Sequence, residues 1–396
     1  MDKKEFLKKY LVNRKNTNSL KWDDLKNRYG DDNLISMWVA DMEFKTEDRI
    51  LEAMKERIDH GVFGYSLIPE DYFITYSNWS TKHYNLPLKK EWIRFCTGVV
   101  TAISWTLNTY TNIGDSCLIL TPVYYPFHDV ITVNKRNLVT VDLKNNNGYF
   151  EIDYEAVERA IIKNKVKLFV QCSPHNPVGR VWKEEELEKL FEICSRYNVL
   201  ILSDEIHQDI ILGNNKFVTA ANVTNGKYRD NLILISSASK TFNLAGLLHS
   251  HIIIFNENLR KIYDEYAKKI NRTEVNILGT VATQAGYQFG EEWLKNILEI
   301  INDNYNYLKN ELHKKAPKII VSSLEGTYLV LLDLREYIPS NKTKEFIQDK
   351  CKLAVDFGEW FGENYKGFVR LNLATDPNLV IKATQNIIKE LKLIKN

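Results

Sequence analysis

The sequence predicts an α/β domain built on a mainly parallel sheet flanked by helices, followed by a smaller α+β domain at the C-terminal end. Two observations support this prediction. Between about residues 91 and 251, short apolar runs alternate with longer amphipathic stretches, which is the pattern of strands joined by helices in a parallel sheet. After residue 251 the alternation stops, and a long helical region is followed by further strands and helices.

The elements of the larger domain follow from their apolar patterns. Buried strands are predicted at residues 116–120, 166–171, 199–203 and 232–235. Residues 183–197 place leucine, phenylalanine and isoleucine on one helical face, so they predict an amphipathic helix between two of these strands. The first forty residues are polar with scattered aromatic side chains, and we expect them to pack along the surface as an arm.

The C-terminal elements differ in kind. Residues 256–314 are predicted to be almost wholly helical, because long amphipathic patterns fill this region. Strands are then expected at 319–321, 327–332 and 367–373, and helices at 342–352 and 379–394.

Composition and charge limit the classes of partner. The 396 residues include 53 basic and 51 acidic side chains, a net charge of +2, which argues against nucleic acid or an anionic membrane as the main partner. The five cysteines, Cys96, Cys117, Cys172, Cys194 and Cys351, form no CxxC pair, and their odd number argues against a disulfide framework. Neither a signal peptide nor a membrane-spanning run is recognisable, so the expected location is the cytoplasm.

Unusual residues follow four of the predicted strands. They are Thr121-Pro122, Ser173 to Pro177, Asp204-Glu205 and Ser236 to Lys240. In open α/β sheets the ligand binds outside the carboxyl ends of the strands. We therefore expect these four loops to converge on one site.

Lys240 is the most informative residue of these loops. It follows the buried run 232–235 and stands among Ser236, Ser237 and Ser239. A desolvated lysine has a lowered pKa, so its neutral amine can form a Schiff base with a carbonyl. The serines can donate hydrogen bonds to a phosphate. Together they suggest pyridoxal 5'-phosphate (PLP), although a serine-rich loop with one lysine is also an ordinary surface turn.

Three further loop motifs each have a structural and a functional interpretation. Asp204 either caps the next element or faces a protonated pyridine nitrogen. Asn176 either shapes a turn or donates to a phenolic oxygen. Gly98-Val99-Val100, between a strand and a helix, either turns the chain or exposes N–H groups to a phosphate.

Aromatic, arginine and histidine residues complete the set of candidates. Tyr124 either covers the core or stacks on a pyridine ring. Arg370 either forms a structural salt bridge or binds a carboxylate with both arms of its guanidinium. His175 and His207 lack a second histidine or cysteine at ligand spacing, so no metal site is predicted.

The order of these motifs resembles that of the fold-type I PLP enzymes of the class I/II aminotransferase superfamily, along nearly the full chain. Several segments are similar, more specifically, to the MalY/PatB cystathionine β-lyase family. They are residues 37–44 (MWVADMEF), 61–65 (GVFGY), 98–100 (GVV), 174–182 (PHNPVGRVW), 203–207 (SDEIH) and 239–243 (SKTFN).

The resemblance implies a domain division and a set of site residues. Residues 1–45 would be an N-terminal arm joining the small domain, 46–290 the large PLP-binding domain and 291–396 the small C-terminal domain. The catalytic residues would be Lys240, Asp204 and Tyr65, the last reaching the site of the neighbouring subunit. The cofactor-binding residues would be Gly98, Val99, Val100, Tyr124, Asn176, Asp204, His207, Ser237, Ser239 and Lys240, and the substrate-binding residues Trp38, Tyr65, Asn176 and Arg370.

The resemblance also implies a function. The expected protein is a cytoplasmic homodimer with shared active sites, which uses PLP to eliminate a thiol from a small sulfur-containing amino acid. An aminotransferase, or a PLP- or amino-acid-sensing regulatory protein, is the alternative. Two positions depart from the related patterns: Glu43 stands where the family usually has aspartate, and Leu248 where many aminotransferases have an arginine for the phosphate.

Overall fold

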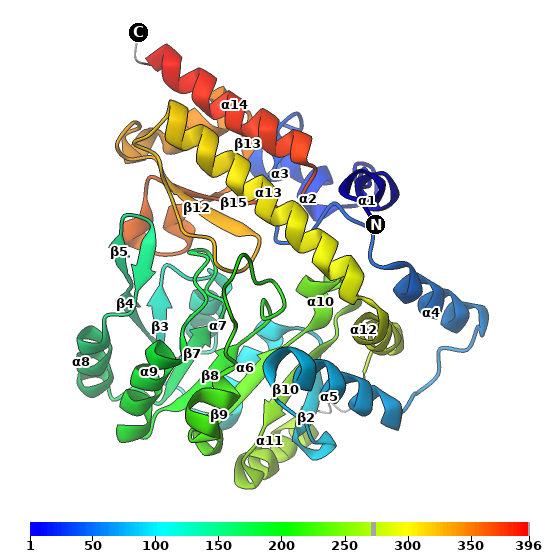
Figure 1. Ribbon diagram of the computed structural model, residues 1–396. Helices are drawn as coiled ribbons and strands as arrows, with labels where there is room; N and C mark the ends of the chain where they lie inside the picture. The colour runs from blue at the N-terminus through cyan, green and yellow to red at the C-terminus, as the bar shows by residue number, and fades with distance from the viewer. Residues whose placement is uncertain (271–274, 395–396) are drawn as a thin grey trace.

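The computed structural model describes residues 1–270 and 275–394, and a seven-stranded sheet lies at its centre (Figure 1). The strand order is β2-β10-β9-β8-β7-β3-β4. Their bounds are β2 (Ile93–Cys96), β3 (Ser116–Thr121), β4 (Asn137–Asp142), β7 (Leu168–Cys172), β8 (Leu200–Asp204), β9 (Leu232–Ser236) and β10 (Ser250–Ile254). The strands from β4 to β9 pair in parallel, and β10 pairs antiparallel with β9 and β2. The predicted mainly parallel sheet is confirmed, and β3, β7, β8 and β9 are the four strands predicted from apolar runs.

Helices cover both faces of this sheet. One face packs against α5 (Glu70–Tyr84), α8 (Tyr154–Asn164), α9 (Glu184–Arg196) and α12 (Ile277–Phe289), and the other against α6 (Val99–Tyr110), α7 (Pro126–Val133) and α11 (Glu257–Lys269). Along β3, Leu118 and Leu120 belong to one apolar cluster, whereas Cys117 and Ile119 belong to the other. Successive side chains of a strand point to opposite faces, so a strand covered on both faces reads as a continuous apolar run.

A second sheet of four antiparallel strands lies above the first, in the order β11-β12-β15-β14. The strands are β11 (Ile320–Val321), β12 (Leu329–Asp333), β14 (Asp356–Phe357) and β15 (Phe368–Asn372). The long helices α13 (Glu291–Lys315) and α14 (Pro377–Ile394) pack side by side over it (Figure 1). The region expected as a helix at 342–352 is helical from 340 to 350, as a 3-10 turn, Ser340–Lys342, that leads into a π-helical stretch, Glu345–Lys350.

The N-terminal residues are joined to this second sheet by more contacts than the surface arm expected from the sequence would make; for example, the carbonyl of Met37 accepts a hydrogen bond from the N–H of Asn372 in β15. They form α1 (Lys3–Tyr10), α2 (Leu20–Asp23), α3 (Leu25–Tyr29) and β1 (Ile35–Ser36), and β1 pairs with β13 (Leu353–Ala354). Helix α4 (Asp48–Asp59) and an irregular, mostly exposed stretch at 60–69 lead back to the large sheet. The remaining elements are α10 (Ala238–Thr241) and the hairpin of β5 (Lys144–Asn146) and β6 (Tyr149–Glu151). The exact domain boundaries stay a prediction.

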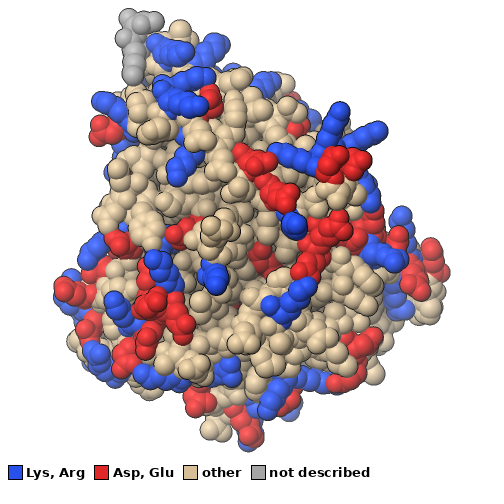
Figure 2. Space-filling view, in the orientation of Figure 1, with Lys and Arg blue, Asp and Glu red and all other residues tan. Residues whose placement is uncertain are grey.

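The surface carries charges of both signs. On the face shown in Figure 2, lysine and arginine side chains are interspersed with aspartate and glutamate. No helix in the described ranges has both the length and the apolar character that a membrane crossing requires.

Candidate active site

The loops that follow the parallel strands enclose a cavity of about 310 Å³. All ten residues predicted to bind a cofactor line it: Gly98, Val99, Val100, Tyr124, Asn176, Asp204, His207, Ser237, Ser239 and Lys240. Each of them lies at or just beyond the carboxyl end of a strand, at the start of α6, or in α10 and the turn before it. The sheet topology therefore brings together residues that are up to 142 positions apart in the chain.

Lys240 lies in α10, a single helical turn that begins directly after β9 and is capped by Ser237. Its Nζ donates a hydrogen bond of 2.7 Å to the carbonyl oxygen of Ala40, which also accepts one of 2.8 Å from the hydroxyl of Tyr328. Burial lowers the pKa of Lys240 to about 8, against the opposing attraction of Asp41. A larger fraction of this amine is therefore neutral near pH 7 than of an exposed lysine, and the neutral form is the one that acts as nucleophile and base.

Asp204 is the last residue of β8 and is buried. Its Oδ1 accepts a hydrogen bond of 3.0 Å from the backbone N–H of Ile206, and no side chain or backbone group of the described chain donates to Oδ2. Burial raises the pKa of Asp204 to about 7. Oδ1 of Asp204 therefore caps the turn after β8, whereas Oδ2 has no donor in the described chain. This second oxygen suits a protonated ring nitrogen.

Arg370 lies just behind the cavity wall and orients Asn176. Its Nη1 donates to Oδ1 of Asn176 at 3.0 Å, which leaves the amide NH₂ of Asn176 without a partner among the described residues. Its Nη2 donates to the carbonyl of Trp38 at 2.9 Å and forms an ion pair with Asp356. The ion pair with Asp356 fits the interpretation of Arg370 as part of a structural salt bridge. The interpretation as a carboxylate-binding residue also remains compatible, because Nε is buried and has no protein partner in the part of the chain that is described.

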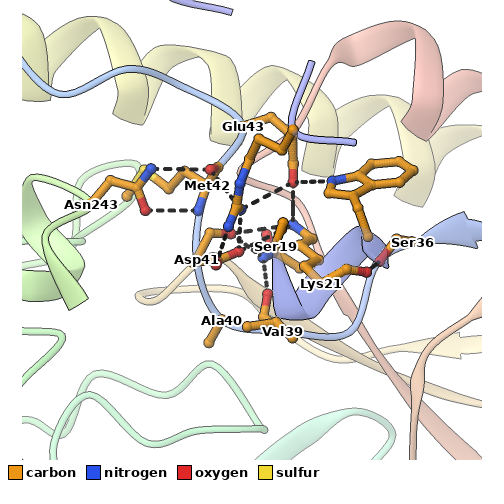
Figure 3. Close-up of polar contacts among 12 residues, drawn as sticks. Ser19, Lys21, Ser36, Val39, Ala40, Asp41, Met42, Glu43 and Asn243 are labelled. Carbon is orange, nitrogen blue, oxygen red and sulfur yellow. Dashed lines mark hydrogen bonds and ion pairs between the residues drawn. The ribbon is translucent and has the colours of Figure 1, made fainter. Parts of the chain in front are cut away.

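The segment from Val39 to Glu43 includes Ala40, which lines the cavity, and is held by side chains from several elements (Figure 3). Asn243 accepts a hydrogen bond from the N–H of Met42 and donates one to its carbonyl, both at 3.0 Å. Glu43 forms an ion pair of 2.8 Å with Lys21, and both side chains are buried. Glutamate is therefore accommodated where the family usually has aspartate. These contacts fix the neighbouring Ala40 carbonyl that Lys240 contacts.

The end of the cavity near α6 is rich in hydrogen-bond donors. Gly98 is the N-cap of α6 and provides no side-chain cap, so the first N–H groups of the helix stay available to an anion. The hydroxyl of Ser237 donates to the carbonyl of His249 at 2.7 Å and accepts from the N–H of Ser239 at 3.1 Å. The proton of the Ser237 hydroxyl is thus already engaged, whereas no residue of the described ranges forms a hydrogen bond with the Ser239 hydroxyl.

Three predicted residues do not line the cavity. Trp38 is buried, and its carbonyl accepts a hydrogen bond from Arg370. Arg370 contacts the cavity through Asn176. Tyr65 is 99% exposed in the irregular stretch after α4, so within one chain it is not part of the site.

Comparison with known proteins places this geometry in a family. The family model for aminotransferase class I and II matches residues 35–387. The chain belongs to this family. It is 33% identical to cystathionine beta-lyase PatB of Bacillus subtilis, over 91% of this chain and 93% of PatB, and 31% identical to the protein MalY of Escherichia coli, over 97% and 98%.

Solved structures agree with this assignment. The PLP-bound C-S lyase of Staphylococcus hominis superposes with a TM-score of 0.90 at 34% identity, covering 96% of this chain and 97% of the lyase. Cystalysin of Treponema denticola, which contains PLP, superposes with a TM-score of 0.92 at 32% identity, covering 96% and 98%. The predicted fold type and family resemblance are confirmed.

The side chains of the cavity fit PLP. Lys240 can bond its aldehyde carbon, Asp204 can accept from its ring nitrogen, and Asn176 can donate to its phenolic oxygen. The start of α6 and Ser239 offer donors for its phosphate. Among the described residues, no protein group competes for the atoms that would bind PLP, except at Lys240, whose amine donates one hydrogen bond to Ala40.

Sequence reasoning missed several residues of this site. Ala40 and Tyr328 contact Lys240 directly or through a shared oxygen, and Asp356 neutralises Arg370. A backbone carbonyl leaves no signal in the side-chain pattern. Asp356 could have been sought as the carboxylate that a buried arginine requires, but its position depends on the pairing of β14 with β15.

Proposed function

We propose that the protein is a PLP-dependent carbon–sulfur β-lyase of the cystathionine β-lyase or cysteine-S-conjugate β-lyase type. The observation that carries this proposal is the similarity to PatB and to solved C-S lyases along nearly the whole chain, with every predicted cofactor-binding residue lining one cavity. The substrate would be a small sulfur-containing amino acid, and the products pyruvate, ammonia and a thiol.

The chain's own residues would perform the proton transfers. PLP, when bound, supplies an electron sink that accepts the electron pair of the Cα–H bond. The neutral amine of Lys240 would take the Cα proton of the substrate. With a pKa of about 8, about a tenth of Lys240 is neutral at pH 7, against well below a thousandth for an ordinary lysine.

The elimination then balances as follows. The electron pair of the Cα–H bond becomes a Cα=Cβ double bond as the Cβ–S bond breaks, and the sulfur leaves with that bond's electron pair. Lys240, which now carries the proton, would donate it to the leaving sulfur. One water molecule is consumed when the resulting enamine is hydrolysed to pyruvate and ammonia.

Asp204, Asn176 and Arg370 would hold the reactants. Asp204 would keep the ring nitrogen protonated, and Asn176 would bind the phenolic oxygen through the amide that Arg370 orients. Arg370 would bind the substrate carboxylate, because its planar fork matches a carboxylate and its Nε is not engaged by the protein in the described part of the chain.

We also infer that the protein acts as a cytoplasmic homodimer with shared active sites. Val62, Phe63, Tyr65 and Leu67 are exposed apolar side chains in one short stretch, which is unusual for the surface of a monomer. If a second subunit covers this stretch, Tyr65 of each subunit would lie near the active site of the other. All five cysteines are buried and in no disulfide, as expected in a reducing compartment.

The test is a substrate panel for the purified protein. Cystathionine should yield pyruvate and a thiol, and cystine should yield pyruvate and a persulfide, without any 2-oxo acid. Alanine with a 2-oxo acid should yield new amino acid much more slowly. Amino transfer that is faster than thiol release would favour the aminotransferase alternative, which shares the family and the cavity. Binding of PLP without turnover of any of these substrates would favour a sensing role.

A further inference from the structure

A chain of three buried polar rings ends at the cavity close to the start of α6. Tyr72 on α5 places its hydroxyl 2.8 Å from Nε2 of His249 and 2.5 Å from Nε2 of His251. His249 is 5% exposed and lines the cavity, whereas His251 is fully buried. None of these three rings was predicted to belong to the site.

His249 lies beside the donors of the cavity. Ser250 pairs with Cys96 across β10 and β2, so His249 is opposite Thr97, two residues before α6 begins. Its backbone carbonyl accepts the hydroxyl of Ser237. The backbone of His249 therefore lies between the start of α6 and the turn that contains Ser237, and the residue lines the cavity together with them.

The hydrogen-bond pattern determines where the protons of the chain lie. Burial lowers the pKa of His249 to about 4 and holds the pKa of His251 well below its ordinary value, so both rings are neutral and each carries one proton. The single proton of the Tyr72 hydroxyl can be donated to only one of them. The other ring must donate its own Nε2–H to the Tyr72 oxygen.

The unpaired Nδ1 of His251 decides between the two arrangements. This atom is buried and has no partner in the described chain. A buried N–H without an acceptor is rarer, and costs more, than a buried acceptor without a donor. His251 therefore carries its proton on Nε2 and donates it to Tyr72, and Tyr72 donates to Nε2 of His249. The proton of His249 is consequently on Nδ1.

The Nδ1–H of His249 is left for a ligand. Its Nε2 is turned toward Tyr72, and no acceptor for Nδ1 is present among residues 1–270 and 275–394. Gly279 lets α12 approach the ring, because a Cβ there would lie 2.7 Å from Cβ of His249. The ring contacts the rings of Tyr72, Phe95 and His251, and His249 also lines the cavity.

We propose that His249 binds the cofactor phosphate through its Nδ1–H, in the role that the arginine corresponding to Leu248 has in many aminotransferases. This inference rests on the proposed PLP-dependent function. The donor is neutral, so it adds a directed hydrogen bond rather than a charge. Tyr72 and His251 are positioning residues that fix its tautomer.

The experiment compares PLP with pyridoxal, which lacks the phosphate, by titrating cofactor-free protein and following absorbance. His249→Gln retains an acceptor for Tyr72 but offers no donor at the Nδ1 position, whereas His249→Asn can place an amide N–H there. His249→Gln should weaken PLP binding by about ten- to hundredfold and pyridoxal binding by less than about threefold. His249→Asn should recover most of the loss, and so should Leu248→Arg added to His249→Gln.

His83→Gln is the matched control, because the His83 ring packs against that of Trp79 and does not line the cavity. It should change neither affinity. Equal losses for PLP and pyridoxal in His249→Gln, or no loss for either, would overturn the assignment of His249 while the proposed function stands. If the unaltered protein does not bind PLP, the proposed function itself fails, and the inference fails with it.

Discussion

Removal of either member of the Arg370–Asp356 ion pair should destabilise the protein strongly. Both side chains are only 2% exposed, so each charge depends on the other for compensation. Arg370→Ala leaves the Asp356 carboxylate unpaired and removes the donors to Asn176 and Trp38. Breaking a buried ion pair on one side costs about 3–5 kcal/mol, and we expect a loss of this size for Arg370→Ala and for Asp356→Ala.

A double variant tests whether Arg370 and Asp356 contribute to the free energy of unfolding as a pair or independently. Arg370→Ala combined with Asp356→Ala leaves no unpaired charge, so its loss should be smaller than the sum of the two single losses by about 1–3 kcal/mol. The assay is urea-induced unfolding of cofactor-free protein, followed by tryptophan fluorescence, because a bound ligand would add to the apparent stability. Losses that add to within about 0.5 kcal/mol would refute the proposed coupling.

Arg370→Lys separates this structural role from substrate binding. The lysine keeps a positive charge opposite Asp356, so much of the lost stability should return. Turnover should remain impaired, because an ammonium group cannot replace a planar fork on a carboxylate. If Arg370→Lys restores both stability and turnover, the interpretation of Arg370 as a carboxylate clamp is wrong.

Three further predictions concern individual residues. Labelling of cofactor-free protein by an acylating reagent should modify Lys240 with a midpoint near pH 8, because burial lowers its pKa from 10.5; a midpoint above 10 would contradict this. Asp204→Ala should retain some PLP but lower turnover by at least about hundredfold, whereas a near-normal rate would show that Asp204 is only a cap. Mixing inactive Tyr65→Ala and Lys240→Ala subunits should restore activity in heterodimers, and the lack of complementation despite verified subunit exchange would exclude shared sites.

The sequence predicted those parts of the fold that depend on local pattern. Strands covered on both faces appear as continuous apolar runs, and β8 and β9 were placed to within about one residue for this reason. Strand β4 is at the edge of the sheet, and its mixed exposed and buried side chains give a weaker signal. The turns of Glu345–Lys350 bury three consecutive residues, a pattern that helical periodicity does not describe.

The site was predictable where side chains provide the chemistry. Lys240, Asp204 and Asn176 were found because their residue types follow strands and match the order of motifs in a known family. The Ala40 carbonyl and the ring chain of Tyr72, His249 and His251 depend on contacts between distant elements, and only the fold shows them. Assignment of each residue to a catalytic or binding role stays a prediction until the variants are measured.

The most direct test of the central claim counts product molecules per subunit. Purified protein with PLP is incubated with cystathionine and no 2-oxo acid, and pyruvate and thiol are measured over time beside a Lys240→Ala control. A β-elimination regenerates the starting enzyme, so pyruvate and thiol should accumulate in equal amounts to many equivalents per subunit, and the control should form neither. Turnover that stops after one equivalent and resumes only when a 2-oxo acid is added would contradict the lyase function and identify an aminotransferase.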